Sequence, residues 1–176
     1  MSKYDVVVIG AGPAGYVYAI RASQLSEKTA IIDKQWLGGV CLNVGCIPSK
    51  ALLKNAEVAQ ILLGGSKEFG FSCENLELDY GAAVKRSRQV SELLTKGVSF
   101  LMRKNNIDVY MGSARIKSRD TITVAGSDGE VKEIKTKNIV VATGTSVAIP
   151  SGWAVDGEKV ITYVKQFCKK SCQSPS

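Results

Sequence analysis

Histidine is absent from this chain of 176 residues. The absence removes the side chain that most often exchanges protons near neutral pH, and it also removes a common zinc ligand. Long apolar runs are absent too, because no run approaches the roughly 18 residues that a membrane-spanning helix needs. The sequence therefore predicts no imidazole-based acid–base catalysis, no metal site and no membrane span.

Aromatic residues make up only 7% of the chain, although its net charge is +7. A basic protein can bind nucleic acid, but such surfaces usually combine Lys and Arg with aromatic rings. Here the basic residues are scattered along the chain without interleaved aromatic residues. We therefore interpret the positive charge as solvated surface rather than as a nucleic-acid site.

From the first residues we expect no targeting segment. Met1-Ser2-Lys3 lead directly into an apolar run that begins at Tyr4, whereas a signal peptide has a charged start, an apolar stretch and a cleavage site. We expect a cytoplasmic protein, or a protein of an organelle matrix from which a transit peptide has been removed. In a reducing compartment a short-spaced cysteine pair is more often catalytic or metal-binding than structural.

Hydrophobic periodicity predicts an α/β fold that begins with a βαβ unit at residues 4–33. The later expected elements are a glycine-rich loop at 34–45, a helix at 47–63, a loop at 64–78, a helix at 80–105, and strands at 107–110, 113–117, 121–125, 131–135 and 138–142. No periodic pattern follows Pro150. We expect one domain at residues 1–150, with a parallel sheet and a small antiparallel β-meander, and a linker or tail at 151–176.

The first strand ends in a motif typical of dinucleotide binding, Gly10-Ala11-Gly12-Pro13-Ala14-Gly15. In such a G-x-G-x-x-G motif, Gly10 permits the tight turn, Gly12 lets a pyrophosphate approach the backbone, and Gly15 allows close helix–strand packing. Pro13 suits the first turn of the following helix, whose N-terminus favours the phosphate charge. The alternative is an ordinary glycine-rich turn.

An acidic residue ends the second predicted strand. Asp33 follows the first glycine of the motif at the distance expected for a residue that binds a ribose hydroxyl. A carboxylate there would repel a 2′-phosphate, so the sequence favours FAD or NAD over NADP. A loop aspartate without this role is the alternative.

Two cysteines, Cys41 and Cys46, lie in the run GGVCLNVGCIPSK at residues 38–50. Gly38, Gly39 and Gly45 allow the backbone to approach a flat partner closely, and Ile47-Pro48 predicts the first turn of a helix. The positive end of a helix dipole favours a thiolate, and Lys50 adds a cation one turn later. The pattern favours a redox-active dithiol or disulfide.

The alternatives for this pair are a metal site or two buried thiols. A metal site needs further ligands, and Cys73, Cys168 and Cys172 do not form a second well-spaced pair. We interpret Cys73 as a lone cysteine and assign no role to the two cysteines in the tail.

Three segments together resemble the flavoprotein disulfide reductases, the pyridine nucleotide–disulfide oxidoreductase family: GAGPAG after a strand, GGVCLNVGCIPSK opening a helix, and VVATGT closing a strand. LNVG and IPSKALL are most similar to the dihydrolipoamide dehydrogenases of that family. Glutathione and thioredoxin reductases more often carry a second lysine at the position of Ser49. The resemblance extends over about residues 3–163.

The resemblance implies an FAD-binding domain with a role for each matching residue. Gly10, Gly12 and Gly15 would line the FAD pyrophosphate with Pro13 and Ala14, and Asp33 would bind the ribose. Cys41 would exchange with a dihydrolipoyl group, and Cys46 would lie against the flavin ring. Lys50 would stabilise negative charge on the reduced ring. The residues that would pack beside the cofactor are Gly39, Val40, Thr143 and Gly144.

The family also implies parts that this sequence does not contain. Its members carry a nicotinamide domain that binds NAD, a second flavin segment, and a dimerisation domain whose His-Glu pair moves the thiol proton in the homodimer. We expect the chain to stop in the linker before the nicotinamide domain. Its partner would be the lipoyl-bearing acyltransferase of 2-oxoacid dehydrogenase complexes. The alternatives are a non-catalytic flavin-binding fragment and a piece of a glutathione or mercuric reductase.

Three positions depart from the family pattern. Asp33 stands where Glu is common, which shortens the ribose contact by one methylene. Val40 stands where Thr is common and removes a hydroxyl. Tyr18 replaces a small residue in the first helix, and we expect its ring to strain the packing of that helix against the sheet.

Overall fold

The computed structural model describes residues 2–72 and 74–168. The predictions for Cys73 and Cys172 therefore lie outside the described residues. The chain divides into two compact units. The first contains the residues up to Asn43 together with Leu94–Val147, and the second contains Val44–Leu93 with the residues from Ala148 onward.

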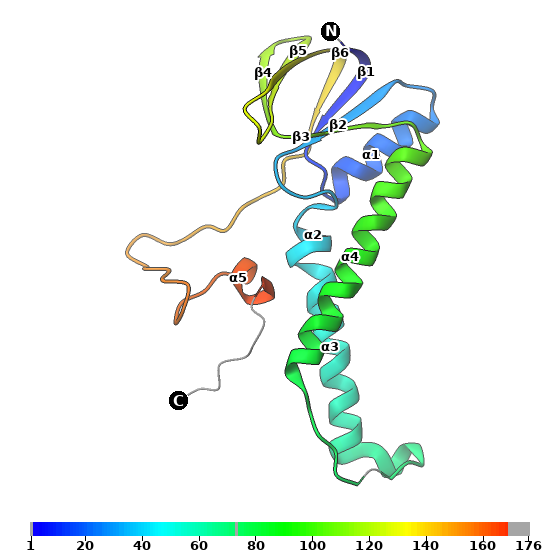
Figure 1. Ribbon diagram of the computed structural model, residues 1–176, viewed down its shortest axis with the longest axis vertical. Coiled ribbons are helices and arrows are strands. Elements are labelled where there is room, and N and C mark those ends of the chain that lie inside the picture. Colours follow the sequence, from blue (N-terminus) through cyan, green and yellow to red (C-terminus); the bar gives the residue numbers. More distant parts are fainter. Residues whose placement is uncertain (1, 73, 169–176) are drawn as a thin grey trace. The chain divides into compact units, whose positions relative to one another are not determined.

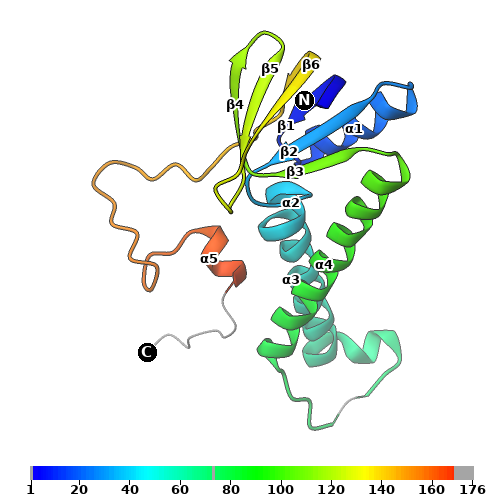
Figure 2. The same ribbon diagram turned by 45° about the horizontal axis from the view of Figure 1, so that its top comes forward.

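The first unit is built on one six-stranded sheet with the order β3-β2-β1-β6-β5-β4. The strands are β1 (Ser2–Ile9), β2 (Thr29–Asp33), β3 (Asp108–Met111), β4 (Ser113–Ser118), β5 (Thr121–Ala125) and β6 (Val131–Val141). Strands β3, β2, β1 and β6 run parallel, whereas β4, β5 and β6 form an antiparallel meander. Strand β6 belongs to both parts (Figures 1 and 2). The predicted parallel sheet with a small meander is confirmed.

Helix α1 (Pro13–Gln24) packs on one face of β1 and β2. Side chains of a strand alternate between the two faces of its sheet, and Val8 lies on the α1 side, close to Gly15. The predicted strain at Tyr18 is wrong. Its ring is 45% exposed, because that position of α1 faces away from the sheet.

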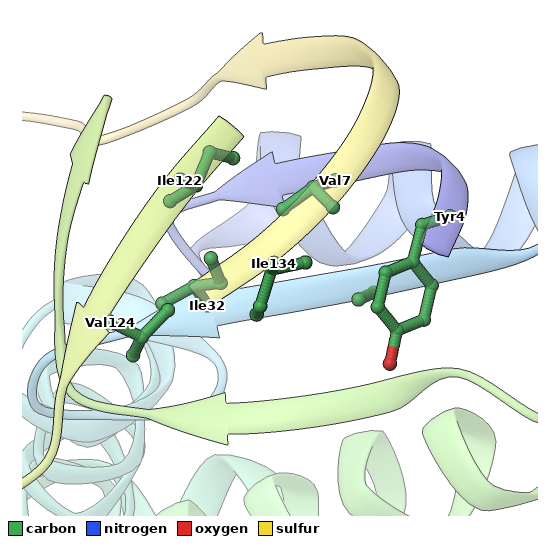
Figure 3. Close-up of a cluster of buried hydrophobic side chains, with 7 residues drawn as sticks. Tyr4, Val7, Ile32, Ile122, Val124 and Ile134 are labelled. Carbon is green, nitrogen blue, oxygen red and sulfur yellow. The ribbon is translucent and has the colours of Figure 1, made fainter. Parts of the chain in front are cut away.

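The opposite face of the parallel strands carries the core that joins them to the meander (Figure 3). The buried side chains are Tyr4 and Val7 from β1, Ala30 and Ile32 from β2, Ile122 and Val124 from β5, and Ile134 from β6. Each is at most 3% exposed. The meander therefore covers the sheet face that α1 leaves free, and both faces of β1 and β2 are buried.

The second unit is helical. It contains helix α3 (Cys46–Gln60), a π-helical turn η1 (Ile61–Gly65), a 3-10 turn η2 (Ser66–Phe69), the first part of helix α4 (Tyr80–Lys104), and helix α5 (Tyr163–Cys168). Arg86 of α4 donates to Asn55 Oδ1 at 2.9 Å and to the carbonyl oxygen of Ala51 at 3.3 Å. These bonds fix α4 beside α3 (Figure 1).

Several predicted elements need correction. The loop at 34–45 contains a short helix, α2 (Gly39–Val44), in which the Asn43 amide donates to the carbonyl oxygens of Leu37 and Gly39. The helix at 47–63 ends as an α-helix at Gln60, and the π-turn η1 continues it. The strands at 131–135 and 138–142 form the single strand β6, because β1 pairs with it along both parts.

Candidate functional site

The turn after β1 is held so tightly that two of its glycines cannot be replaced without a clash. Gly10 has a φ of +107°, and a Cβ there would lie 2.1 Å from the carbonyl oxygen of Ala142 and 3.0 Å from Thr143 Cα. A Cβ on Gly15 would lie 1.8 Å from the carbonyl oxygen of Gly10. Packing within the protein therefore explains both glycines, and it places Thr143 beside the turn.

Gly12 differs from these two glycines, because the protein itself does not require it. Its φ is −72°, which any residue adopts, and a Cβ there would find its nearest neighbour, Gly39 Cα, at 4.0 Å. Gly12 is the N-cap of α1, and Pro13 follows in the first turn. The missing side chain leaves space at a helix N-terminus, where backbone N–H groups and the helix dipole favour an anion. A dinucleotide pyrophosphate fits this position.

A second backbone segment lies directly against the glycine turn. Gly39 opens α2 with a φ of +62°, and a Cβ there would lie 2.5 Å from Gly12 Cα. The N–H of Gly38 donates to the carbonyl oxygen of Ala11 at 2.8 Å. These contacts place the beginning of the cysteine segment against the dinucleotide motif. The predicted roles of Gly12 and Gly39 therefore share one region.

The carboxylate of Asp33 is bound to backbone. Its Oδ2 accepts the N–H of Ala11 at 2.7 Å, and its Oδ1 accepts the N–H of Gln35 at 2.8 Å and that of Trp36 at 3.0 Å. The side chain is half-buried at the end of β2. Sequence reasoning placed Asp33 near the motif but missed its bond to Ala11. An Asp that follows a strand often binds backbone N–H groups two or three residues later, and this signal predicts only the Gln35 and Trp36 contacts.

The other residues expected near the cofactor are accessible. Pro13, Ala14, Val40, Thr143 and Gly144 are exposed, and Gly144 has a φ of +67°. Thr143 and Gly144 follow β6 after one residue, Ala142, and the carboxyl end of β6 lies next to that of β1. Ligands of open α/β sheets bind beyond the carboxyl ends of the strands. The accessible positions are thus compatible with their predicted roles.

The two cysteines of the motif belong to different units. Cys41 lies in α2 and is half-buried, whereas Cys46 is the first residue of α3 and is exposed. Gly45 is the N-cap of α3, and the Ser49 hydroxyl donates to its carbonyl oxygen at 2.6 Å. Lys50 is exposed one turn after Cys46. The predicted helix start is confirmed within one residue, and the disulfide stays a prediction.

The family pattern for "Pyridine nucleotide-disulphide oxidoreductase" matches residues 4–173. The chain belongs to this family. The match includes the glycine turn, the cysteine segment and the end of β6, which are the regions described above.

Relatives within this pyridine nucleotide–disulphide oxidoreductase family include two dihydrolipoyl dehydrogenases. That of Mycobacterium tuberculosis is 46% identical over 170 residues, which cover 97% of this chain and 36% of the relative. A mitochondrial one from Dictyostelium discoideum is 41% identical over 170 residues, which cover 96% and 35%. The chain therefore spans about a third of the length of these relatives.

Solved structures of flavoprotein disulfide reductases share the fold. The HOCl-induced enzyme RclA of Escherichia coli, in a copper complex, superposes with a TM-score of 0.72 at 27% identity. The alignment covers 86% of this chain and 31% of that structure. Among the residues that the structure describes, no group of three or more Cys, Asp or Glu side chains is arranged to hold a metal ion. Nor do these residues include a helix with the length and apolarity to cross a membrane.

Proposed function

We propose that this chain forms the FAD-binding and redox-cysteine part of a dihydrolipoyl dehydrogenase. The observation that carries the proposal is the space at Gly12. Gly10, Gly15 and Gly39 are explained by close packing, but no contact among residues 2–72 and 74–168 requires the missing side chain of Gly12. A pyrophosphate at the N-terminus of α1 explains it.

The nucleotide half of the site would use the first unit. The backbone at Gly12, Pro13 and Ala14 would bind the pyrophosphate, and Asp33 would contact the adenosine ribose. Thr143, Gly144, Gly39 and Val40 would contact other parts of the same cofactor. A carboxylate near the ribose also disfavours a 2′-phosphate, which agrees with FAD rather than NADP.

The thiol half would use the cysteine segment. One thiolate of a dihydrolipoyl group attacks the sulfur of Cys41 in a Cys41–Cys46 disulfide and releases the Cys46 thiolate. The second substrate thiol then attacks the substrate sulfur bound to Cys41, which closes the lipoyl disulfide and leaves Cys41 reduced. The cysteine pair thus gains two electrons, and the substrate loses two.

When bound, FAD would supply the oxidant for this reduced pair, with NAD as the final electron acceptor of the full-length enzyme. Within the chain, the N-terminus of α3 would stabilise the Cys46 thiolate, and Lys50 would add positive charge one turn later. The chain has no histidine, so the substrate thiol proton would be accepted by a base outside these residues.

The surroundings of this reaction are also part of the proposal. The names of the relatives support a dihydrolipoyl group as the substrate. They favour this substrate over glutathione or mercuric ion. The partner would be a lipoyl-bearing acyltransferase of a 2-oxoacid dehydrogenase complex, and the complete assembly would be a homodimer. The compartment would be the cytoplasm or an organelle matrix; the relative from Dictyostelium is named as mitochondrial.

The visible spectrum of the purified chain with FAD tests the proposal. The chain should retain FAD after gel filtration. One equivalent of dithiothreitol should then produce a long-wavelength band, because the Cys46 thiolate would lie against the oxidised flavin. Cys46→Ser should abolish the band, and Cys41→Ser should show it without reductant, because Cys46 then has no disulfide partner in the motif. Cys73→Ser is the matched control and should behave like the wild type.

Two results would contradict the proposal in different ways. Retained flavin without a thiol-dependent band would indicate a non-catalytic flavin-binding fragment. A colourless chain would remove the flavin site altogether.

A further inference from the structure

The carboxylate of Asp33 has a limited capacity to bind a ligand. An ionised carboxylate accepts about four hydrogen bonds, two on each oxygen. Oδ1 already accepts two, from the N–H groups of Gln35 and Trp36, and Oδ2 accepts one from Ala11. A single acceptor position, on Oδ2, therefore stays open.

The same carboxylate connects two segments of the backbone. Ala11 belongs to the glycine turn, whereas Gln35 and Trp36 begin the segment that leads to α2. The second segment also returns to the first, since the Gly38 N–H donates to the Ala11 carbonyl oxygen at 2.8 Å. Both hydrogen-bonding groups of Ala11 are thus fixed, one by Asp33 and one by Gly38.

The strand behind Asp33 makes this connection rigid. The backbone carbonyl oxygen of Asp33 accepts the N–H of Gly112 at 2.8 Å. The carbonyl oxygen of the preceding residue, Ile32, accepts the N–H of Gly10 at 2.7 Å. Ile32 is fully buried. Asp33 is therefore anchored to the sheet, and its carboxylate transmits that anchoring to Ala11, the residue before Gly12.

We propose that Asp33 is a positioning residue that clamps the glycine turn to the segment 34–38, and that it accepts only one hydroxyl of an adenosine ribose. The second statement rests on the proposed function, because it needs a bound nucleotide. The first concerns the chain alone. A carboxylate free of backbone bonds would instead bind both ribose hydroxyls together.

Amide hydrogen exchange tests the clamp without any ligand. In Asp33→Asn, the amide group has one acceptor oxygen and cannot accept all three N–H bonds, so the Ala11 amide should exchange about tenfold faster or more. Asp156→Asn is the matched control. Asp156 also accepts three backbone N–H groups, but all come from its own loop, at Glu158, Lys159 and Val160. That variant should leave Ala11 exchange unchanged.

Ribose analogues test the single open position. The affinities of ADP, 2′-deoxy-ADP and 3′-deoxy-ADP are measured on the wild-type chain by calorimetry. One deoxy analogue should bind about fivefold to tenfold more weakly than ADP, and the other within about twofold of it. In Asp33→Asn the difference between the two analogues should disappear. If Asp33 only stabilised the fold, Asp33→Asn would not remove the difference in affinity between the two deoxy analogues.

The outcomes separate the clamp from the proposed function. Unchanged Ala11 exchange in Asp33→Asn overturns the clamp, whatever the chain binds. Weaker binding of both deoxy analogues overturns the single-hydroxyl statement, because the carboxylate then has two open positions. If ADP does not bind at all, the ribose statement and the nucleotide site are both wrong, whereas the exchange result still decides the clamp. Asp33→Glu, which keeps the charge, replaces Asp33→Asn if the latter does not fold.

Discussion

The sheet unit and the helical unit differ in how their residues are held. In the sheet unit Val7, Val8 and Ile31 are completely buried. In the helical unit the buried apolar residues include small ones such as Ala51, while Leu53 of α3 is 67% exposed. Side chain–backbone bonds such as that of Arg86 to Ala51 add to the contacts there.

This difference distinguishes the glycine turn, which belongs to the sheet unit, from Cys46, the first residue of α3 in the helical unit. The glycine turn is fixed by backbone contacts within a dense core, so its geometry is set before a ligand binds. The exposed Cys46 stands at the start of a helix with a sparser set of buried residues. A site for tight nucleotide binding needs the first arrangement, and a thiol that meets a substrate needs accessibility.

The largest effect should come from the glycine turn. Gly15→Ala places a methyl group 1.8 Å from the Gly10 carbonyl oxygen, so α1 or the turn must move. The free energy of unfolding should fall by roughly 4 kcal/mol or more. Gly12→Ala is the matched control and should change it by about 1 kcal/mol at most, since a Cβ fits there. Urea unfolding measures both, and equal losses would contradict the assignment of Gly12 to a ligand.

The next effect compares the cores of the two units directly. Ile122→Ala removes a fully buried side chain from the sheet core and should lower the free energy of unfolding by about 3 kcal/mol. Leu53→Ala removes an exposed side chain from α3 and should change it by about 0.5 kcal/mol at most. Chemical denaturation of both variants checks this. A comparable loss for Leu53→Ala would show that the side chains of the helical unit contribute as much to the free energy of unfolding as those of the sheet core.

A smaller effect concerns the polar end of the sheet core, where the Tyr4 hydroxyl donates to Asp108 Oδ2 at 2.6 Å and lies 2.7 Å from the Tyr110 hydroxyl. Burial, followed by the hydrogen bonds to Asp108 and Tyr110, raises the pKa of Tyr4 far above its ordinary value near 10. A raised pKa in the folded state means that the contribution of Tyr4 is complete below pH ~10 and is lost as the pH rises further.

Tyr4→Phe should therefore lower the free energy of unfolding by about 1 kcal/mol at neutral pH. Above pH ~10, the free energy of unfolding of this variant should fall less steeply with pH than that of the wild type. Tyr163→Phe is the control, because its ring is 37% exposed, and it should keep the wild-type slope. The free energy of unfolding, measured from pH 7 to 11.5, gives both quantities. A Tyr4→Phe slope as steep as that of the wild type would show that Tyr4 does not titrate in this way.

The smallest effect should come from α4, the helix that extends through both units. Gly97→Ala adds a methyl group that meets no atom within 4 Å, and it should stabilise the protein by about 0.5–1 kcal/mol because glycine is unfavourable within a helix. Gly144→Ala meets equally open space, but its φ is +67°, so it should destabilise by about 1 kcal/mol. Thermal unfolding distinguishes the signs, and two changes of the same sign would contradict the backbone argument.

Sequence patterns predicted the elements whose periodicity is strong. Helix α4 begins at the predicted residue and ends one residue early, and β5 has the predicted bounds. A tight turn joins β5 to β6, and within it the Gly126 N–H donates to the carbonyl oxygen of Glu130 at 2.9 Å. These elements depend on local signals, namely an apolar stripe, Gly129 at a positive φ, and alternating side chains.

The elements that were missed depend on tertiary partners. Glycine disfavours a helix start, so α2 was predicted as loop, but Gly39 is fixed by its close approach to Gly12. The predicted strands stop at residue 135 and restart at residue 138, which divides β6 at Thr136 and Lys137, although β1 pairs with Thr136 and again from Asn138 onward. For the site, the sequence predicted which residues matter at the glycine turn, but not that the Asp33 carboxylate would be bound to Ala11.

The central claim is that the space at Gly12 exists for a dinucleotide, and FAD binding to the wild-type and Gly12→Ala chains tests it most directly. Quenching of flavin fluorescence should show binding to the wild type and an affinity at least about tenfold lower for Gly12→Ala, while the unfolding free energies stay within about 1 kcal/mol of each other. Equal affinity in the two chains would contradict the claim.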